Sequence, residues 1–361
     1  MPTSPMRNLA YRAALPVFAP RWRGKHAVQG VNSFKEYEKI LRRHHVMGAS
    51  LLLVDGDRQA TVYSGCGPET LFRVASITKM ATALVTLRLC EEGLLALDQP
   101  VEEVLPKGHD ALRDVTVRHL LSHTSGLVDT GEAVLLRGGT YLEALRSASR
   151  PGDAMVYCNL GFGLLGCVME HVTGQSLETV FQEKLFAPLG MRATLEGASV
   201  DERIIQPIYR VLPYRRKPVT VTELGRKPLS APDPLRHFGH TAGAMYTDAA
   251  SLSKLLSAIW PGGFLSETLT NEMRARQATT PDRVYGLGLV LLTRPELSRS
   301  RLLGHQGFAY GCVDGAFVEE GTGRQVIFLN GGASEARTGR LGLVNRDVLK
   351  WALNEEMPSW T

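Results

Sequence analysis

Short apolar runs mark the two ends of the chain, and longer helical patterns occupy the region between them. Residues 49–54 form a compact apolar run, the Asp55-Gly56 pair favours a hairpin turn, and residues 59–63 can pair back onto that run. Strand signals return near the C-terminus in three apolar or alternating ranges: 284–292, 308–319 and 325–330. The pattern therefore predicts one antiparallel sheet that the two ends of the chain build together.

Helical patterns flank this sheet and fill the middle of the chain. Ser33 and Glu36 form a capping box for a helix that runs to about Val46, and residues 347–353 favour a terminal helix. Residues 118–189 carry helical signals with glycine-rich breaks. The predicted fold class is α+β, of the α/β sandwich type: an antiparallel sheet built from both chain ends, flanked by helices, with a helical insertion.

The same pattern divides the chain into an extension and one large domain. Residues 1–32 are basic and lack clear periodicity, whereas residues 33–361 carry the periodic elements. We expect three parts in the domain: a sheet subdomain of about 33–75 and 241–361, a mainly helical subdomain of about 76–196, and an irregular, lid-like segment of about 197–240. Prolines and basic residues are concentrated in the last segment, as in functional lids or mobile loops.

Composition narrows the classes of function. The chain has 361 residues, 44% of them hydrophobic, and a dispersed net charge of +5 without a nucleic-acid-binding motif, so no nucleic-acid partner is expected. Its five cysteines show no C-x-x-C spacing, which fits reduced thiols in a cytoplasmic setting. Arg12 interrupts the apolar stretch Leu9–Pro20, and no run reaches membrane length, so neither a signal peptide nor a stable membrane span is expected. The oligomeric state stays open.

The strongest candidate for chemistry lies at the start of a buried helix. The run Met80–Cys90 is almost wholly apolar and Gly93 can end it, which places Ser76 in or near the first helical turn. Residues three apart share a helix face, so the Lys79 ammonium can reach the Ser76 hydroxyl. Burial favours the neutral form of a lysine, and a neutral lysine beside a serine is a nucleophile with its own base. Backbone N–H groups of the helix start suit a developing oxyanion.

Three other patterns resemble functional motifs but lack the context that those motifs need. Ser251 and Lys254 repeat the S-x-x-K spacing without partner motifs. Residues 161–166 match G-x-G-x-x-G, yet a turn rather than a strand precedes them. His119 and His123 have a metal-ligand spacing without a third ligand, and the leucines around them favour packing and capping roles. We therefore expect neither a cofactor nor a metal ion.

Two further stretches fit the serine and lysine. Tyr157 and Asn159 follow a turn and precede an apolar helix, so both can project into one cleft, the tyrosine as a proton shuttle and the asparagine as an amide ligand. His305 and Gly307 precede a strand, where the glycine allows close approach of a ligand and the histidine supplies a donor or a positive charge near pH 7. His237 begins a competing match, but no strand follows it.

Together these motifs resemble the serine β-lactamase-like superfamily, which includes class C β-lactamases, D-alanyl-D-alanine carboxypeptidases and related esterases and D-aminopeptidases. Its three signatures, S-x-x-K, Y-x-N and [KH]-x-G, occur in family order at 76–79, 157–159 and 305–307. The block Thr241–Tyr246 also looks like a family block. The resemblance covers about residues 33–355 and implies a β-lactamase/transpeptidase-like catalytic domain.

The resemblance implies a role for each motif residue. Ser76 would be the acylated nucleophile, and Lys79 would be its base or proton relay. Tyr157 would activate water for deacylation, Asn159 would hold Lys79 and the substrate carbonyl, and His305 would stabilise the site from the sheet edge. The oxyanion hole and substrate-binding positions would be Ser76, Gly307 and Phe308.

Two departures from the family pattern bear on the expected activity. His305 stands where the best-known class C β-lactamases have lysine, which is typical of related peptidases and esterases. Cys158 lies between the tyrosine and the asparagine, where a small buried filler is favoured over a rival nucleophile. The implied function is a serine hydrolase that forms acyl-Ser76 with a small-molecule ester or D-amino-acid-like amide. An acyltransferase with the same intermediate, and a catalytically silent ligand-binding or scaffold protein, are the alternatives.

Overall fold

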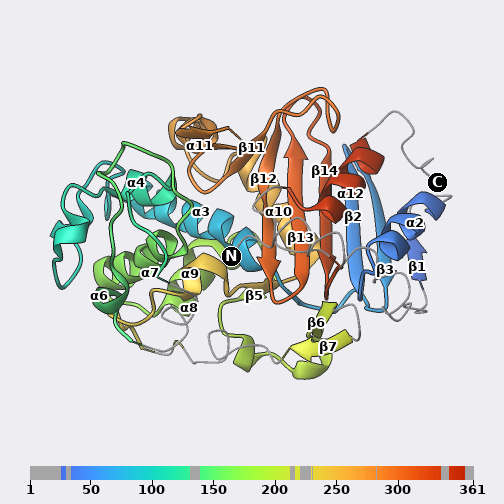
Figure 1. Cartoon of the computed structure of the whole chain (residues 1–361), viewed down its shortest axis with the longest axis horizontal. Helices are drawn as coiled ribbons and strands as arrows, with labels where there is room; N and C mark the ends of the chain where they lie inside the picture. The colour runs from blue at the N-terminus through green and yellow to red at the C-terminus, as the bar shows by residue number, and fades with distance from the viewer. Residues whose placement is uncertain are drawn as a thin grey trace, which may run out of the picture.

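A nine-stranded antiparallel sheet forms one half of the molecule and helices form the other (Figure 1). The computed structural model describes residues 26–29, 34–130, 139–211, 216–219, 229, 231–281, 283–334 and 341–353. The strand order of the sheet is β1-β3-β2-β14-β13-β12-β11-β10-β9. Its strands are β1 (His26–Gln29), β2 (Ala49–Asp55), β3 (Arg58–Ser64), β9 (Ala278–Thr280), β10 (Arg283–Tyr285), β11 (Val290–Leu292), β12 (Leu302–Ala309), β13 (Cys312–Glu319) and β14 (Gln325–Asn330).

The strands from the N-terminal part of the chain join those from the C-terminal part inside the sheet, where β2 pairs with β14. Strand β14 pairs with β2 from Gln325 opposite Val54 to Asn330 opposite Ala49. Strands β2 and β3 form the hairpin that the turn Asp55-Gly56 favours, and Gly56 takes a φ of +60°, which glycine adopts without strain. The predicted α+β fold class, with an antiparallel sheet from both ends, is confirmed.

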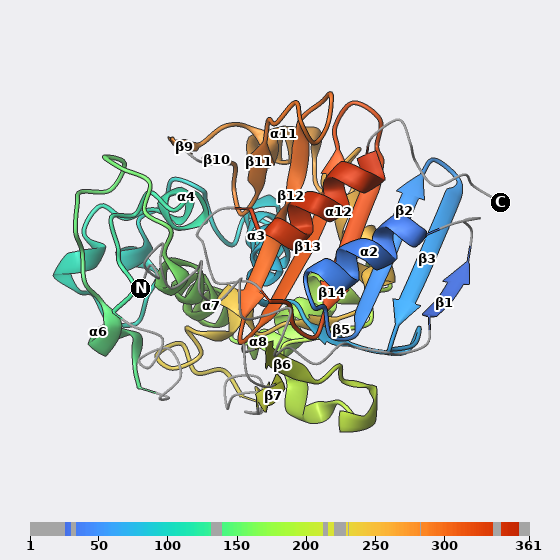
Figure 2. The ribbon, with the colours of Figure 1, turned by 45° about the vertical axis from the view of Figure 1, so that its right-hand side comes forward.

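Helices cover both faces of the sheet, which explains the continuous apolar runs 51–54 in β2 and 326–329 in β14. Figure 2 shows α2 (Lys35–Arg43) and α12 (Leu343–Leu353) lying across one face. Helix α10 (Ala249–Ile259) packs on β2, β13 and β14 from the other face. Alternate residues of one strand therefore enter different cores: Leu51 and Leu53 pack with α2 and α12, and Leu52 packs with the helical half.

The helical half lies between the two sheet-forming parts of the chain. Its helices are α3 (Thr78–Glu91), α4 (Val117–Leu121), α6 (Tyr141–Ala144), α7 (Asn159–Thr173), α8 (Leu177–Phe181), a π-helix (Gln182–Phe186) and α9 (His240–Gly243). Helix α11 (Glu267–Arg274) contacts α3. Short 3-10 turns span Ala75–Ile77, Val101–Glu103, Asp110–Leu112, Gly197–Ser199 and Glu202–Ile204. A small sheet of order β4-β8-β5 joins Phe72–Arg73, Tyr246–Thr247 and Ala193–Thr194.

Several predicted boundaries are wrong. Helix α2 ends at Arg43 rather than near Val46, and the proposed cap Ser33 lies outside the described residues. The range 284–292 contains two short strands, β10 and β11, separated by residues 286–289. Leu287 and Leu289 of this connection are buried in the core, so its apolar composition does not require a strand.

The segment 197–240 is less irregular than the sequence predicts. Strands β6 (Ile208–Val211) and β7 (Arg216–Val219) pair antiparallel within it. The sequence did not indicate this hairpin because prolines, including Pro218 inside β7, interrupt the strand pattern. In a two-stranded sheet each strand has one open edge, where proline is tolerated.

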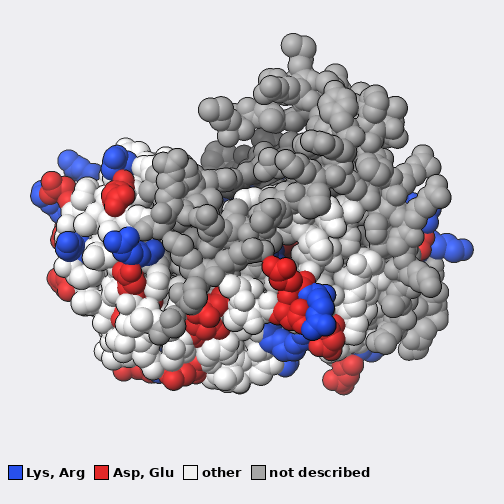
Figure 3. Space-filling model, turned by 90° about the horizontal axis from the view of Figure 1, so that it is seen from below, with Lys and Arg blue, Asp and Glu red and all other residues white. Residues whose placement is uncertain are grey.

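The described surface carries charges of both signs. On the face shown in Figure 3, Lys and Arg side chains lie beside Asp and Glu, and no region of one sign stands out among the coloured atoms. In the described part of the chain, no helix is both long enough and apolar enough to cross a membrane.

Candidate active site

Ser76 lies in a tight turn directly before α3. The 3-10 turn Ala75–Ile77 leads into the helix, so the serine precedes the first α-helical turn rather than lying within it. The Thr78 hydroxyl donates to the Ala75 carbonyl oxygen at 2.6 Å and accepts from the Met245 N–H at 3.2 Å, which fixes the turn. Ala75 has a φ of +45°, in a region that residues with a side chain rarely adopt.

Lys79 is fully buried beside the serine. Its Nζ lies 3.3 Å from Ser76 Oγ, 2.8 Å from Asn159 Oδ1 and 2.7 Å from the Ala242 carbonyl oxygen. Apart from buried threonines, the buried helix residues around Lys79 are apolar, so these three oxygens make burial of its amino group tolerable. The S-x-x-K motif could not predict the contact with the Ala242 carbonyl oxygen, which belongs to the backbone of α9.

Asp129 is a member of the site that the sequence did not indicate. Its Oδ2 accepts from Asn159 Nδ2 at 2.8 Å, which turns the asparagine oxygen toward Lys79. Its Oδ1 accepts from the N–H groups of Asn159 at 2.8 Å and Leu160 at 2.9 Å, so it caps the start of α7. A sequence pattern reveals caps only among neighbouring residues, whereas Asp129 stands 30 positions before Asn159.

Tyr157 completes the contacts of the serine oxygen. Its hydroxyl donates to Ser76 Oγ at 2.8 Å, and Lys79 Nζ lies 5.0 Å from the centre of its ring. The tyrosine belongs to the loop directly before α7, whose first residue is Asn159. The structure therefore brings together the serine, lysine, tyrosine and asparagine that the S-x-x-K and Y-x-N spacings single out.

The third motif lies within a strand rather than before one. Strand β12 begins at Leu302 and pairs with β13 throughout, so Phe308 is near its end. Strand β11 pairs only with Leu302–Gly304, which leaves the far side of residues 305–309 without a strand partner in the described part of the sheet. A Cβ on Gly307 would lie 2.3 Å from the Val74 carbonyl oxygen, so only glycine lets β12 approach the turn that carries Ser76.

Of the two roles expected for His305, a donor or a positive charge near pH 7, the burial of the ring favours the neutral donor. The side chain is buried, and desolvation, with a smaller contribution from the Lys79 charge, lowers its pKa to about 3. Its Nδ1 lies 2.6 Å from the Gln306 carbonyl oxygen, and its ring centre lies 6.4 Å from that of Tyr157. A motif shows which residue stands at a position but not how deeply the fold buries it.

The Cys158 thiol is a poor nucleophile in this environment. It is 1% exposed, and desolvation raises its pKa to about 12, with the Asp129 carboxylate acting in the same direction. Because the thiolate is the reactive form of cysteine, the buried thiol is inert at neutral pH. Its predicted role as a small filler fits this burial.

The competing serine–lysine pair has structural contacts. Ser251 lies in α10, and its hydroxyl accepts from the Arg192 N–H at 2.8 Å. The Lys254 ammonium donates to the Gly190 carbonyl oxygen. This pair therefore ties α10 to the loop before β5, without a contact to the tyrosine or asparagine of the second motif.

The histidine patterns likewise have structural partners. His119 Nδ1 accepts from the Thr116 N–H at 3.2 Å in a capping box, and His237 Nδ1 lies 2.7 Å from the buried Glu170 carboxylate. His123 Nδ1 accepts from the Cys158 N–H at 3.2 Å. Within the described ranges no three His, Cys, Asp or Glu side chains are grouped to hold a metal ion.

The glycine motif at 161–166 is a packing device of α7. A Cβ on Gly163 would lie 1.4 Å from the Phe238 carbonyl oxygen, and one on Gly166 would lie 2.8 Å from Thr241 Oγ1. The glycines therefore let residues 238–241 pass close to the helix. They lie inside α7 rather than between a strand and a helix, so the motif is not a phosphate-binding turn.

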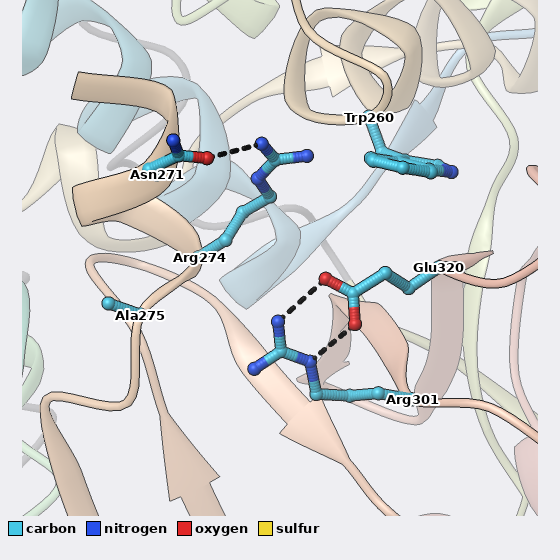
Figure 4. Close-up of a pocket in the computed structure, with 6 residues that line it drawn as sticks. All are labelled: Trp260, Asn271, Arg274, Ala275, Arg301 and Glu320. Carbon is cyan, nitrogen blue, oxygen red and sulfur yellow. Dashed lines mark hydrogen bonds and ion pairs between the residues drawn. The ribbon is translucent and has the colours of Figure 1, made fainter. Parts of the chain in front are cut away.

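A separate open pocket lies between the ends of α10 and α11 and the sheet (Figure 4). It encloses about 220 Å³ and is lined by Trp260, Asn271, Arg274, Ala275, Arg301 and Glu320. Arg301 makes a bidentate ion pair with Glu320, at 2.7 and 2.9 Å, and the Arg274 guanidinium lies 5.1 Å from the Trp260 ring. None of its lining residues belongs to the serine cluster.

Two of the solved structures with a similar fold are an amidase and an amidohydrolase. The D-amino acid amidase from Ochrobactrum anthropi SV3, complexed with D-phenylalanine, is 25% identical, with a TM-score of 0.70 over 88% of this chain and 96% of the amidase. A D-stereospecific amidohydrolase from Streptomyces sp. is 27% identical, with a TM-score of 0.68 over 84% of this chain and 96% of the other.

Sequence comparison leads to the same superfamily. Esterase EstB from Burkholderia gladioli is 32% identical over 326 residues, which cover 78% of this chain and 82% of the esterase. The family model described as Beta-lactamase matches residues 32–342, most of the chain. With this match and these relatives, the chain belongs to the Beta-lactamase family, as a serine hydrolase of the β-lactamase-like superfamily.

Proposed function

We propose that Ser76 is the nucleophile of this hydrolase and forms an acyl-enzyme with small esters or D-amino-acid-like amides. One observation carries the proposal: Ser76 Oγ lies 2.8 Å from the Tyr157 hydroxyl and 3.3 Å from Lys79 Nζ. Two groups that can move protons thus contact one alcohol oxygen, as nucleophilic catalysis by serine requires. The serine is half-buried, and its oxygen has both neighbours.

Lys79 is suited to accept the serine proton. Asn159 Oδ1 and the Ala242 carbonyl oxygen can only accept, so each of these contacts uses one N–H of the lysine. A neutral amine has two N–H groups and one lone pair, and the remaining position faces Ser76 Oγ. In this state Lys79 takes the proton as Ser76 attacks the acyl carbon, and the resulting ammonium donates to all three oxygens. As the bond to the leaving group breaks, the ammonium gives this proton to the departing alcohol or amine and becomes neutral again.

The two remaining steps fall to the tyrosine and the strand. Tyr157 takes a proton from the water that attacks the acyl carbon and passes its own hydroxyl proton to Ser76 Oγ, which leaves as the free serine hydroxyl, because the tyrosine hydroxyl already donates to this oxygen. The N–H groups of Ser76 and Phe308 form the oxyanion hole, and each such donor lowers the barrier by about 3–4 kcal/mol. Gly307 allows the approach of β12 that this arrangement needs, and the neutral His305 packs behind the tyrosine.

The substrate class rests on the site and the relatives together. One similar protein is named an esterase, and two similar structures are a D-amino acid amidase and a D-stereospecific amidohydrolase. Acyl transfer from Ser76 to water is common to esters and amides, so one site can serve both. The relatives do not favour an acyltransferase or a catalytically silent scaffold.

Active-site labelling tests the nucleophile. A fluorophosphonate should add its mass to Ser76, and Ser76→Ala should abolish both labelling and ester hydrolysis. Ser251→Ala is the matched control, because it removes the other serine of the same spacing and should leave labelling intact. Label on Cys158, or label that persists in Ser76→Ala, would exclude the assignment.

A substrate panel tests the substrate class. Purified enzyme is offered short-chain esters, D- and L-amino acid amides and a β-lactam, and acyl-Ser76 is followed by intact mass. We expect turnover of a short ester or of a D-amide in preference to its L-isomer. Equal turnover of both amide isomers, together with no ester hydrolysis, would contradict the proposed class.

A further inference from the structure

His123 holds Tyr157 from several sides. The Cys158 N–H donates to His123 Nδ1 at 3.2 Å, and the Val156 N–H donates to the His123 carbonyl oxygen at 2.9 Å. The ring of His123 packs against the Tyr157 ring, with centres 4.4 Å apart and planes inclined by 33°. One residue therefore fixes the backbone before and after the tyrosine and supports its ring.

The backbone of His123 is itself in an uncommon conformation. Its φ is +61°, in the left-handed region where asparagine, aspartate and histidine are the commonest residues besides glycine. The side chain is only 2% exposed. Such conformations persist where surrounding contacts determine them, and they are concentrated at functional sites. The conformation directs the carbonyl oxygen and Nδ1 of one residue to the two ends of the 156–158 segment.

The protonation state of the ring suits this arrangement. Burial lowers the pKa of His123 well below its ordinary value, and the Lys79 charge acts in the same direction, so the ring is neutral. Because Nδ1 accepts from the Cys158 N–H, the ring proton lies on Nε2. The neighbouring Tyr285 ring lies 5.3 Å away and nearly perpendicular, at 84°. The histidine thus supplies an acceptor without adding a charge beside Lys79.

We propose that His123 is a positioning residue, whose Nδ1 acceptor keeps the Tyr157 hydroxyl at the Ser76 oxygen. This inference rests on the proposed function, because it concerns the deacylation step assigned to Tyr157. Loss of the acceptor leaves the Cys158 N–H buried without a partner, so the segment that carries Tyr157 rearranges. Deacylation then slows, whereas attack by Ser76, assisted by Lys79 from another element, is affected less.

Two substitutions separate the acceptor from the backbone conformation. Asparagine and glycine both tolerate a positive φ, but only asparagine offers an oxygen near the position of Nδ1. His123→Asn should therefore keep Tyr157 in place for deacylation, and His123→Gly should not. His119→Gly is the matched control, because it removes a half-buried histidine four positions earlier, whose Nδ1 caps α4 and which has no described contact with Tyr157. His123→Ser, whose hydroxyl is too short for the contact, replaces the glycine variant should that variant not fold.

Two rates are measured in each variant: labelling of Ser76 by a fluorophosphonate, and release of the acyl group from a preformed acyl-Ser76, followed by intact mass. In His123→Gly we expect release to slow by about tenfold or more and labelling to change by less than about threefold, since misplacement of a catalytic group by about 1 Å has large effects. In His123→Asn and His119→Gly both rates should stay within about threefold of the wild-type rates.

The outcomes distinguish this inference from the proposed function. If wild-type Ser76 is not labelled, the proposed function itself fails. If wild-type Ser76 is labelled but His123→Gly releases the acyl group as fast as the wild type, only the role of His123 is refuted. The role is also refuted if the asparagine variant is as slow as the glycine variant, or if His119→Gly reproduces the defect.

Discussion

At the residue scale, the backbone of Ala75 sets the position of the serine that follows it. A positive φ costs a residue with a side chain roughly 1–2 kcal/mol, whereas glycine adopts it freely. The greater conformational entropy of glycine in the unfolded chain lowers the free energy of unfolding by about 0.4–1 kcal/mol. Since Ala75 has a φ of +45°, Ala75→Gly should raise the free energy of unfolding by up to about 1 kcal/mol and leave Ser76 labelling unchanged. Urea denaturation and fluorophosphonate labelling measure the two effects.

Ala75→Val provides the opposite control. A branched side chain is least tolerated at positive φ, so this variant should be less stable than the wild type. A glycine variant that is less stable than the wild type, or a valine variant that is more stable, would show that the turn before Ser76 is not under this strain.

The buried His305 makes stability depend on pH. Its pKa in the folded protein is about 3, below the ordinary value of 6.5, so between these values the unfolded chain binds a proton that the folded protein does not. Stability should therefore fall as the pH drops below about 6.5, by about 2 kcal/mol for this residue between pH 7.5 and 5. Urea denaturation at the two pH values measures the change, to which the buried His123 contributes with the same sign.

His305→Gln isolates the contribution of this residue. The variant cannot take up a proton, so its free energy of unfolding should change less between the two pH values than that of the wild type. The same loss of stability in the variant would mean that other groups cause it. Activity is not the readout here, because His305 lies beside Tyr157.

How far the sequence could predict the site depends on whether each contact lies within a motif. Ser76 and Lys79 lie together because they are three positions apart on one short turn of chain, which spacing alone indicates. The orientation of Asn159 by Asp129, and the Lys79 contact with the Ala242 carbonyl, arise from tertiary packing that a motif does not contain. Whether His305 is a neutral donor or positively charged stayed open for the same reason, since burial decides it.

At the element scale, the glycines of α7 set how closely residues 238–241 approach the helix. Gly163→Ala would place a Cβ 1.4 Å from the Phe238 carbonyl oxygen, so the two segments must separate. We expect a loss of about 1–3 kcal/mol in the free energy of unfolding, as overpacking typically costs. Thermal and urea denaturation measure it. Lys79 should also lose its contact with the Ala242 carbonyl, which would slow Ser76 labelling.

Gly161→Ala is the matched control in the same helix. Its Cβ would meet Leu120 at 3.6 Å, an ordinary contact, and alanine is the better helix former by about 1 kcal/mol. This variant should be as stable as the wild type or more stable. If both alanine variants behave alike, helix propensity rather than close packing determines the effect at these glycines.

Elements with a continuous apolar pattern could be predicted, whereas elements that depend on their neighbours could not. The hairpin β2–β3 has both a strong pattern and a turn dipeptide, and it was located to within one or two residues. The predicted range 308–319 is wrong as a single strand, because it joins the end of β12 to the whole of β13. The start of β12 was missed because Gly304, His305 and Gly307 weaken its strand pattern, although pairing with β13 forms it. The hairpin β6–β7 was missed because local composition favours a loop.

At the scale of the whole molecule, the central strands couple the two cores. In β14, Ile327 packs with the helical half and Phe328 packs with α2 and α12 on the opposite face. Each strand thus contributes to both layers, so neither layer can unfold without exposing apolar residues of the other. The serine cluster draws on α3, the loop before α7, α9 and β12, and it lies where the helical half meets the sheet (Figure 1).

This coupling predicts a single cooperative unfolding transition. Trp351 stacks on Tyr37 in the α2–α12 layer, and Trp260 packs against the core of the helical half, so each reports on one layer. In variants that keep only Trp351 or only Trp260, fluorescence, far-UV circular dichroism and hydrolase activity should be lost at the same urea concentration. If the Trp351 signal changes at lower urea than the Trp260 signal, the outer helical layer unfolds independently. Activity that disappears before both signals would instead show that the serine cluster is less stable than the sheet that connects the two cores.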